Sequence, residues 1–309
     1  MNTRRRFLGG AAALAAASLS PFGFAQAPRT RLVLLGTGGG PRVTAKGRAK
    51  PATLIVVNNV PYVIDCGDGV ALQLVRAGVA LDALRYVFIT HHHSDHNLDY
   101  GNLIYDGWAA GLRTPVDAYG PAPIKTITEA YWQLNRFDIE TRIADEGRID
   151  LRKLVSAHEF SAPGLVMQNA DVKVTAARVR HPPIKEAYAY RFDCADRSIV
   201  ISGDTTVSPE LVALAKGADV LVCEAMHLGG LENLLKKVPN ASTLREHLLA
   251  SHIVTEDLGK LAAEAGVKTL VLSHLVPSDD PSISDAMWEE GVRKHYGGTI
   301  VVGRDLMEV

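Results

Sequence analysis

Three features are scarce in this chain of 309 residues, and each absence excludes a class of protein. Three cysteines are too few for a small fold held together by disulfides. Basic and acidic residues nearly balance, 33 against 34, so the excess of positive charge typical of nucleic-acid-binding proteins is missing. The longest apolar stretch, near the N-terminus, is shorter than the about 20 residues of a membrane-spanning helix. What remains, with 47% hydrophobic and 22% charged residues, is typical of a globular enzyme-sized domain.

The first 27 residues differ from the rest of the chain. Three arginines at positions 4–6 precede a Phe-Leu pair and an alanine-rich stretch, and positions 25–27 read Ala-Gln-Ala. A positive start, a short apolar stretch and a small-residue cleavage site are typical of a secretory signal. The consecutive arginines resemble a twin-arginine signal, with an ordinary Sec signal as the alternative. The sequence therefore predicts a signal peptide over 1–27, a mature domain over 28–309 and a periplasmic location without a membrane anchor.

Cys66, Cys194 and Cys223 match no paired metal-binding spacing. We expect them to be small side chains in apolar surroundings. One disulfide with one thiol left over is the alternative in an oxidising compartment.

Apolar patterning after residue 30 predicts alternating strands and helices without an internal repeat. Strands are expected at 31–35, 53–57, 62–64, 86–90, 172–179, 188–192, 198–202, 220–223, 269–273 and 299–302. Helices are expected at 70–77, 124–134, 209–216, 255–265 and 284–295. These elements fit two packed sheets with helices outside. The segment 135–168 has no clear pattern and is expected to be a lid or an insertion near the site.

The segment that follows the apolar strand at 86–90 carries His91, His93, Asp95 and His96. Because alternate residues of an extended chain point to the same side, His91 and His93 can bind one ion. Asp95 and His96 lie past the bend and can face a second ion. Imidazole nitrogens and carboxylate oxygens suit zinc, and also iron or manganese. Four such residues within six positions at a strand end predict a metal site.

This His-x-His-x-Asp-His pattern resembles the metallo-β-lactamase superfamily. The resemblance extends over residues 31–302 and implies an α/β fold, a four-layer αββα sandwich, with a hydrolase domain over 28–309. The other ligands of the family pattern match His181, Asp204 and His274, each just past a predicted strand. The resemblance implies two Zn²⁺ ions, with iron or manganese as alternatives. The implied ligand sets are His91, His93 and His181 for the first metal, Asp95, His96 and His274 for the second, and Asp204 as the bridge.

Such a dinuclear site, in which we count Asp95 among the catalytic residues, can hold a hydroxide between the ions and clamp the attacked ester. Because the pKa of a metal-bound water falls to about 7, no serine or cysteine nucleophile is required. His92 lies between the ligands but points the other way, so we expect it to have a packing or supporting role.

Further segments narrow the resemblance. The implied bridge at Asp204 argues against a true β-lactamase, because the resembling enzymes of that class lack this acid. The glycine-rich stretch 36–40 and the Asp-Cys-Gly-Asp-Gly run at 65–69 resemble the ribonuclease Z branch, which includes zinc arylsulfatases and phosphodiesterases. Glu224 matches its H-E-A-T segment, and His252 matches its H-S-T segment, although neighbouring positions differ. The resemblance implies that His252 helps to protonate the leaving oxygen, or holds the charged group, and that Glu224 orients it. A surface histidine and a structural glutamate are the alternatives.

Several other side chains could contact a substrate. The glycine-rich stretch lacks the Gly-Lys-Ser/Thr ending of a phosphate-binding loop, so we expect a tight bend beside the metals. Lys46, Arg48 and Lys50 follow it and could attract an anion or be solvated. Five aromatic residues could line an apolar entrance or pack in the core: Tyr105, Trp108, Tyr131, Trp132 and Phe137. Four histidines match no ligand segment: His158, His227, His247 and His295, with His227 the first candidate for a role in the site.

Together these observations predict an exported dinuclear hydrolase of small anionic sulfate or phosphate esters, closest to the arylsulfatases. The alternatives are a phosphodiesterase acting on cyclic nucleotides or RNA, a lactonase, and a metal-binding protein without catalysis. A nucleic-acid partner is not expected. Without the arginines at 4–6 the chain has 30 basic and 34 acidic residues, and the basic arm of tRNA-processing relatives is not evident at 135–168. Related enzymes are often dimers, and a homodimer is consistent with them.

Overall fold

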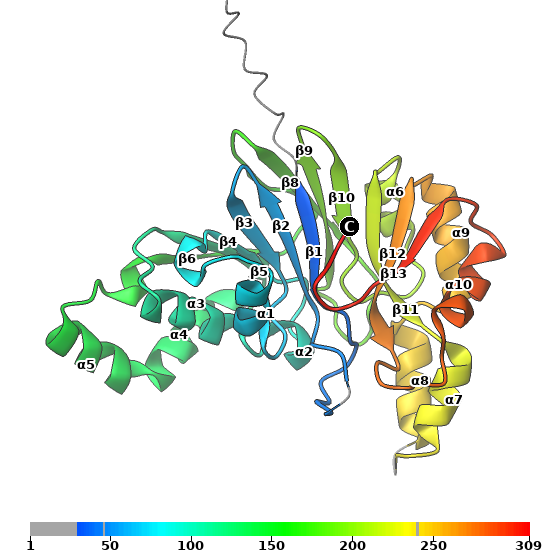
Figure 1. The fold of residues 1–309 in the computed structure, drawn as a ribbon, viewed down its shortest axis with the longest axis horizontal. Helices are drawn as coiled ribbons and strands as arrows, with labels where there is room; N and C mark the ends of the chain where they lie inside the picture. The colour runs from blue at the N-terminus through cyan, green and yellow to red at the C-terminus, as the bar shows by residue number, and fades with distance from the viewer. Residues whose placement is uncertain (1–29, 46, 239–240) are drawn as a thin grey trace, which may run out of the picture.

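Two seven-stranded sheets pack face to face with helices on their outer faces in the computed structural model, which describes residues 30–45, 47–238 and 241–309 (Figure 1). The order of layers is helix, sheet, sheet, helix, which confirms the predicted αββα sandwich. The predicted signal peptide and Lys46 lie outside the described residues. Export stays a prediction from the sequence, and so does a homodimer.

The first sheet has the strand order β14-β1-β2-β3-β4-β5-β6. Its strands are β1 (Arg31–Gly36), β2 (Ala52–Val57), β3 (Val60–Ile64), β4 (Tyr86–Phe88), β5 (Val116–Pro121), β6 (Val155–Phe160) and β14 (Met307–Glu308). The turn between β2 and β3 places Asn58 and Asn59 at φ 50° and 65°. Asparagine tolerates this left-handed conformation, which a tight hairpin requires. From β3 to β6 the strands run parallel.

The second sheet has the strand order β13-β12-β11-β10-β9-β8-β7. Its strands are β7 (Gly164–Gln168), β8 (Val172–Arg178), β9 (Tyr188–Cys194), β10 (Ser198–Ile201), β11 (Val220–Met226), β12 (Thr269–Val276) and β13 (Thr299–Val302). Strands β10 to β13 are parallel, and β9 is antiparallel to both β8 and β10. The carboxyl ends of β8, β10, β11 and β12 therefore meet at one edge, where α/β proteins place their sites.

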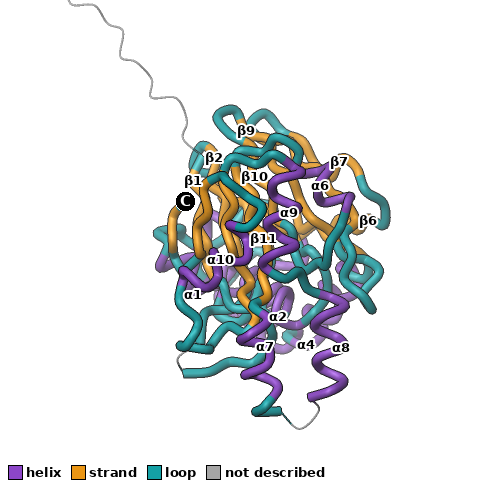
Figure 2. Tube along the Cα trace, turned by 90° about the vertical axis from the view of Figure 1, so that its right-hand side faces the viewer, coloured by secondary structure: helices purple, strands orange, loops and turns teal. Residues whose placement is uncertain are grey.

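The helices form three groups. Against the first sheet lie α1 (Val70–Arg76), α3 (Tyr100–Ala109), α4 (Ile124–Leu134) and α5 (Arg136–Glu146). Against the second lie α6 (Pro209–Ala215), α9 (Thr255–Ala265) and α10 (Asp285–Arg293). At the lower end of the sandwich lie α2 (Ser94–Asn97), α7 (Leu228–Leu235) and α8 (Ala241–Ser251) (Figures 1 and 2). Among the described residues, no helix is both long and apolar enough to span a bilayer.

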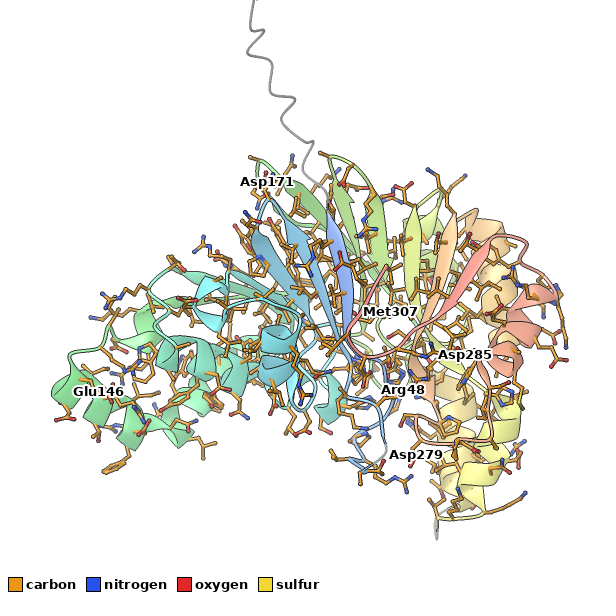
Figure 3. All side chains as sticks on the ribbon, viewed as in Figure 1. Arg48, Glu146, Asp171, Asp279, Asp285 and Met307 are labelled. Carbon is orange, nitrogen blue, oxygen red and sulfur yellow. The ribbon has the colours of Figure 1, made fainter. Side chains whose placement is uncertain are left out.

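The segment 135–168 is neither a lid nor an insertion near the site, so the prediction of one or the other was wrong. It forms α5, a short 3₁₀ turn (Leu151–Lys153), and the edge strands β6 and β7 of the two sheets. Glu146, the last residue of α5, lies at the far side of the molecule from Asp279 (Figure 3). The prediction failed because a single residue of α5, Ile139, is buried, so the helix has little apolar periodicity.

Aromatic side chains fill the space between the sheets. Phe88 is fully buried and contacts the rings of Tyr119, Tyr190 and Phe192 at 5.2–5.5 Å between centroids. On the outer face of the first sheet, Trp108 lies in the core beneath α3.

The aromatic residues proposed as an entrance do not form one. Four of them, Tyr105, Trp108, Tyr131 and Trp132, belong to the core or pack against it, and Phe137 is 86% exposed on α5. The cysteines are all free thiols, with Cys66 and Cys223 buried and Cys194 half-buried, as expected for small side chains.

We expect Phe88→Ala to lower the free energy of unfolding by about 3–5 kcal/mol, because it leaves a cavity between the sheets. Phe137→Ala removes the same atoms from an exposed site and should change stability by less than about 0.5 kcal/mol. Urea unfolding of the two variants measures the difference. Equal losses would contradict the assignment of Phe88 to the central core.

Candidate metal centre

The first histidine cluster joins both sheets. His91 and His93 follow β4 of the first sheet, and His181 follows β8 of the second. His93 Nδ1 lies 3.2 Å from His91 Nε2 and 3.0 Å from His181 Nε2. The structure therefore brings together the three residues predicted for the first metal, and their ligand atoms, with one from Asp204, lie within 4.8 Å of one another.

The second cluster consists of Asp95, His96 and His274. Asp95 and His96 lie on the short helix α2, past the bend that the sequence predicted. Asp95 Oδ2 lies 3.6 Å from His96 Nε2 and 3.3 Å from His274 Nε2.

His274 reaches the second cluster through a β-bulge. Glu224 of β11 pairs with Ser273, and Ala225 pairs with Leu275, so His274 is the extra residue of β12. Its φ of 41° is rare for a residue with a side chain. A bulge turns a side chain away from its regular direction, and such devices occur beside functional sites. The strand predicted at 269–273 thus continues through His274 to Val276, which the sequence pattern did not reveal.

Asp204 lies between the clusters and faces both. Its Oδ2 lies 3.8 Å from the Nε2 atoms of His91 and His181. Its Oδ1 lies 3.1 Å from His96 Nε2 and 3.2 Å from His274 Nε2. This is the arrangement expected of a bridging carboxylate. Asp204 is only 2% exposed, and its neighbour Gly203 has a φ of 59°, so the loop after β10 is held in a turn that favours glycine.

The chemistry of the two clusters fits metal ions. Burial lowers the pKa of His181 to about 4 and holds that of His91 well below its ordinary value, so both rings are neutral and have a free lone pair for a metal. Burial opposes the charge of Asp204, but His274 and His96 hold its pKa well below the ordinary value. The buried atoms His96 Nε2 and Asp204 Oδ1 lie 3.1 Å apart without the alignment of a hydrogen bond, and within the described part of the chain neither has another hydrogen-bond partner. Unsatisfied buried polar atoms are costly, and a bound cation would satisfy them.

The spacing of the ligand atoms also suits zinc. Ligands of a tetrahedral zinc site, with bonds of about 2.0–2.1 Å, are about 3.4 Å apart. Neighbouring donor atoms here are 3.0–3.8 Å apart. The clusters are therefore candidate metal-binding sites.

A layer of hydrogen bonds supports the ligands. Asp65 Oδ2 lies 2.8 Å from His96 Nδ1, and the same carboxylate accepts hydrogen bonds from the backbone and hydroxyl of Thr90. His181 Nδ1 lies 2.9 Å from the carbonyl oxygen of Ser251. Such partners fix the tautomer and orientation of a metal-binding histidine. Sequence reasoning assigned no role to Asp65. Its position directly after β3 is nevertheless like that of the cluster residues, which also follow strands.

The glycine-rich stretch after β1 is the tight bend that the sequence predicts, and it lies beside the second cluster. A Cβ atom on Gly39 would lie 2.8 Å from Cε1 and Nδ1 of His274. The backbone amide of Gly40 donates a 2.9 Å hydrogen bond to Asp95 Oδ2. Glycine is therefore required for close approach, and the loop orients one carboxylate of the second cluster.

Glu224 and His252 form a buried pair beside the clusters. His252 Nδ1 lies 2.9 Å from Glu224 Oε2, and Glu224 Oε1 accepts a 2.5 Å hydrogen bond from the amide of Thr205. Burial opposes the charge of His252, but Glu224 raises its pKa to about 9. The His252 ring stacks on His274 at 5.6 Å between centroids. Because Nδ1 is hydrogen-bonded to Glu224, Nε2 is the nitrogen of His252 that can contact a substrate. His252 is 7% exposed, so it is not a surface histidine.

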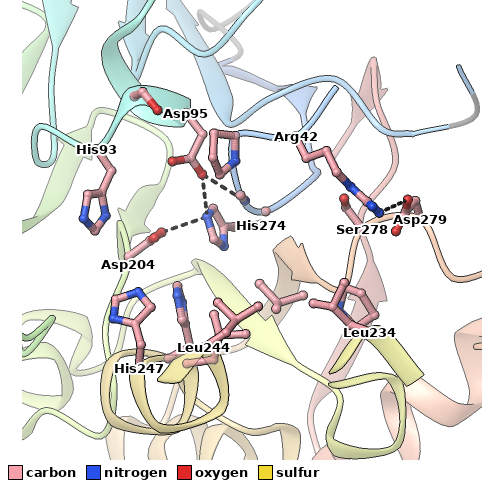
Figure 4. A pocket seen from close by; sticks show the side chains of 18 of the residues that line it. Arg42, His93, Asp95, Asp204, Leu234, Leu244, His247, His274, Ser278 and Asp279 are labelled. Carbon is pink, nitrogen blue, oxygen red and sulfur yellow. Dashed lines mark hydrogen bonds and ion pairs between the residues drawn. The ribbon is translucent and has the colours of Figure 1, made fainter. Parts of the chain in front are cut away.

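A cavity of about 410 Å³ opens beside the second cluster (Figure 4). Its polar side carries Asp95, Asp204, His252 and His274. Neither Arg48 nor Lys50 lines it, although the sequence left open whether these two cations attract an anionic substrate or are solvated. Arg48 Nη1 instead donates to Thr37 Oγ1 and to the carbonyl oxygen of Gly303. Lys50 is buried and donates to the carbonyl oxygen of Arg42. Both side chains hold loops together.

The remaining histidines lie outside the two clusters, in different settings. His92 Nε2 lies 2.9 Å from the carbonyl oxygen of Pro121, outside both clusters, as the sequence predicts. His227 Nδ1 accepts a hydrogen bond from Gly230 at the start of α7, so it is a helix cap. His247, not His227, lines the cavity, with its ring 6.5 Å from that of His93 and 6.2 Å from that of His252. His158 and His295 lie on the surface, in ion pairs with acids.

Comparison with known proteins identifies the family. Residues 61–275 match the family model described as the beta-lactamase superfamily domain. The chain belongs to the metallo-β-lactamase superfamily. A ribonuclease Z of Mycobacterium sp. (strain KMS) is 33% identical over 281 residues, which cover 90% of this chain and 95% of that protein. The fold and the candidate clusters together make this chain a metal-dependent hydrolase of the superfamily.

Solved structures share the fold. The metallo-β-lactamase fold protein YhfI of Bacillus subtilis superimposes with a TM-score of 0.66 at 19% identity, over 91% of this chain and 99% of that chain. The short form of human tRNase Z gives a TM-score of 0.66 at 19% identity, over 90% of this chain and 98% of that chain. At these identities the likeness establishes the architecture alone.

Asp65→Asn should lower zinc affinity by about 10–100-fold, because it removes the negative charge that supports His96. Competition with a chromogenic chelator measures this affinity. Asp68→Asn makes the same change three residues further on, at an exposed position, and should leave affinity unchanged. If the two variants bind zinc equally well, Asp65 does not support the ligand.

Proposed function

We propose that this protein is a dinuclear metal-dependent phosphodiesterase. The observation that carries the proposal is the position of Asp204, whose two carboxylate oxygens face two separate sets of ligands. Two cations held by these sets would suit displacement at a phosphate, because they would stabilise the charge on the attacking and leaving oxygens. The pair of Glu224 and His252 beside this bridge supplies a group that can protonate the leaving oxygen.

Phosphate is preferred over sulfate because of the relatives. Curated proteins matching 90% of this chain are named ribonuclease Z, and ribonucleases cleave phosphodiesters. No relative reported above supports the arylsulfatase activity that the sequence analysis placed first. The phosphodiesterase alternative therefore becomes the proposal, and sulfate esters become the comparison in its test.

The proposed ions are two Zn²⁺, with iron or manganese as alternatives suited to the same ligands. His91, His93 and His181 would hold the first, Asp95, His96 and His274 the second, and Asp204 both. When bound, two divalent cations lower the pKa of water and neutralise the charge of the attacked ester.

The protein's own residues orient the substrate and supply the proton. Glu224 fixes the ring of His252 through Nδ1 and stabilises its charged form. His252 Nε2 then donates a proton to the departing oxygen, which matters most when that oxygen is a poor leaving group.

Zinc-loaded wild-type protein should hydrolyse bis-nitrophenyl phosphate at a higher kcat/KM than nitrophenyl sulfate. His91→Ala should lose one metal and at least about 100-fold in turnover, because the first cluster is broken. His158→Ala, a change on the surface, is the matched control and should keep both. Faster cleavage of the sulfate would overturn the proposal in favour of an arylsulfatase.

His252→Ala should reduce kcat about 10²–10⁴-fold for phosphodiesters with alkyl leaving groups, and far less for nitrophenyl esters. The reason is that nitrophenolate departs without protonation. Glu224→Gln should show the same trend more weakly. The His252 ring keeps a hydrogen-bond partner at position 224, but that partner no longer carries a negative charge. The measurement is the dependence of log kcat on the pKa of the leaving group. Parallel losses across all esters would remove His252 as the acid.

A further inference from the structure

The cavity beside the clusters has one polar side and one aliphatic side. The aliphatic side also holds Val238, and its main residues are Leu234 on α7, Leu244 and Leu248 on α8, and Val276 at the end of β12 (Figure 4). Leu244 and Leu248 are four residues apart, so they lie on the same face of α8. We call these four residues the aliphatic floor.

The floor is supported from behind. Leu248 and Val276 belong to a separate buried cluster together with Met226, Leu231 and Leu235, and Leu234 and Leu244 pack against it. This cluster joins α7 and α8 to the end of the second sheet. The hairpin of α7 and α8 is therefore a packed wall of the cavity, and an apolar ligand can use the floor without rearranging it.

The aliphatic floor lies next to the proposed acid, His252. His252 follows directly after the last residue of α8, Ser251, and lines the cavity together with Leu248. Leu244 lines the same cavity, so a group that departs beside His252 can extend toward these two leucines.

The lining does not suit a nucleic-acid strand. Within the described ranges, Arg42 is the one lysine or arginine at the cavity, and its Nη2 is paired with Asp279 Oδ2 at 2.6 Å. No phenylalanine, tyrosine or tryptophan of the described part lines the cavity. Sites for single-stranded nucleic acid combine cations along the backbone with aromatic rings that stack on bases, whereas the described lining of this cavity offers one paired arginine and no such ring. The volume of about 410 Å³ is that of a small-molecule site.

We propose that the aliphatic floor makes this protein selective for small phosphodiesters whose leaving group is an apolar alcohol or phenol, rather than for RNA. The proposal rests on the proposed phosphodiesterase function and names its substrate class. It assigns specificity to Leu244 and Leu248, which no ligand pattern in the sequence indicates.

The test is a series of methyl phosphodiesters of phenol, 4-methylphenol, 4-ethylphenol and 4-propylphenol. These leaving groups have nearly equal acidity, so the chemistry is constant while apolar area grows. For wild-type protein loaded with zinc, kcat/KM should rise roughly two- to fourfold with each carbon, the factor for moving one methylene out of water. A 3′-extended tRNA precursor is included in the same assay and should be cleaved less efficiently than the propylphenyl ester.

Leu244→Asn should at least halve the slope of log kcat/KM against chain length. Leu244 is half-buried, so the fold should survive the change. The slope is a ratio within one preparation and does not depend on how much of the variant is folded. Leu72→Asn on α1, where the side chain is 54% exposed, is the matched control and should keep the full slope.

The outcomes separate the two proposals. A flat series with clear cleavage of the phenyl ester, or preferred cleavage of the tRNA precursor, would overturn the role of the floor and leave the phosphodiesterase standing. Cleavage of none of these diesters would overturn the phosphodiesterase itself. An unchanged slope in Leu244→Asn would remove the floor as the cause of selectivity.

Discussion

The carboxylate of Asp204 is the constraint on which the rest of the site depends. Its two oxygens are 3.1–3.8 Å from histidine nitrogens that come from both sheets. A buried carboxylate is stable only where positive charge or donors surround it. The histidines therefore have to converge on it, and the chain accepts unusual backbone to achieve this. Gly203 takes a left-handed conformation, and His274 is the bulged residue of β12.

The candidate ligands could be predicted from sequence because each is placed by a local feature. His91 to His96 form one short polar segment after an apolar strand, and His181 and Asp204 each follow a strand within a few residues. Strand ends are recognisable from apolar runs, and parallel strands bring their carboxyl ends together. The resemblance to a known family then set the order of the ligands. The αββα layers follow from the same strands.

What the sequence could not predict depends on distant packing. Arg48 and Lys50 look like solvent-exposed cations near a loop, but the structure uses both to hold neighbouring backbone. Asp65 supports His96 across 31 positions of sequence. Trp108 and Phe137, which the sequence analysis grouped together as aromatic residues, have opposite burial in the structure. None of these relations is periodic or local, so neither strand nor helix patterns record them. The aliphatic floor was missed because α7 and α8 were not recognised as helices, and because the cavity that they line depends on distant packing.

The hairpin of α7 and α8 begins shortly after Glu224 in the sequence and ends at Ser251, directly before His252. The hydrogen bond between Glu224 and His252 joins the two ends of this segment, while the part between them forms the cavity wall. The segment can be lengthened, shortened or re-lined without moving Glu224 or His252. A protein built in this way can acquire a new substrate by exchanging one hairpin, as an antibody changes antigen by exchanging a loop on a constant framework.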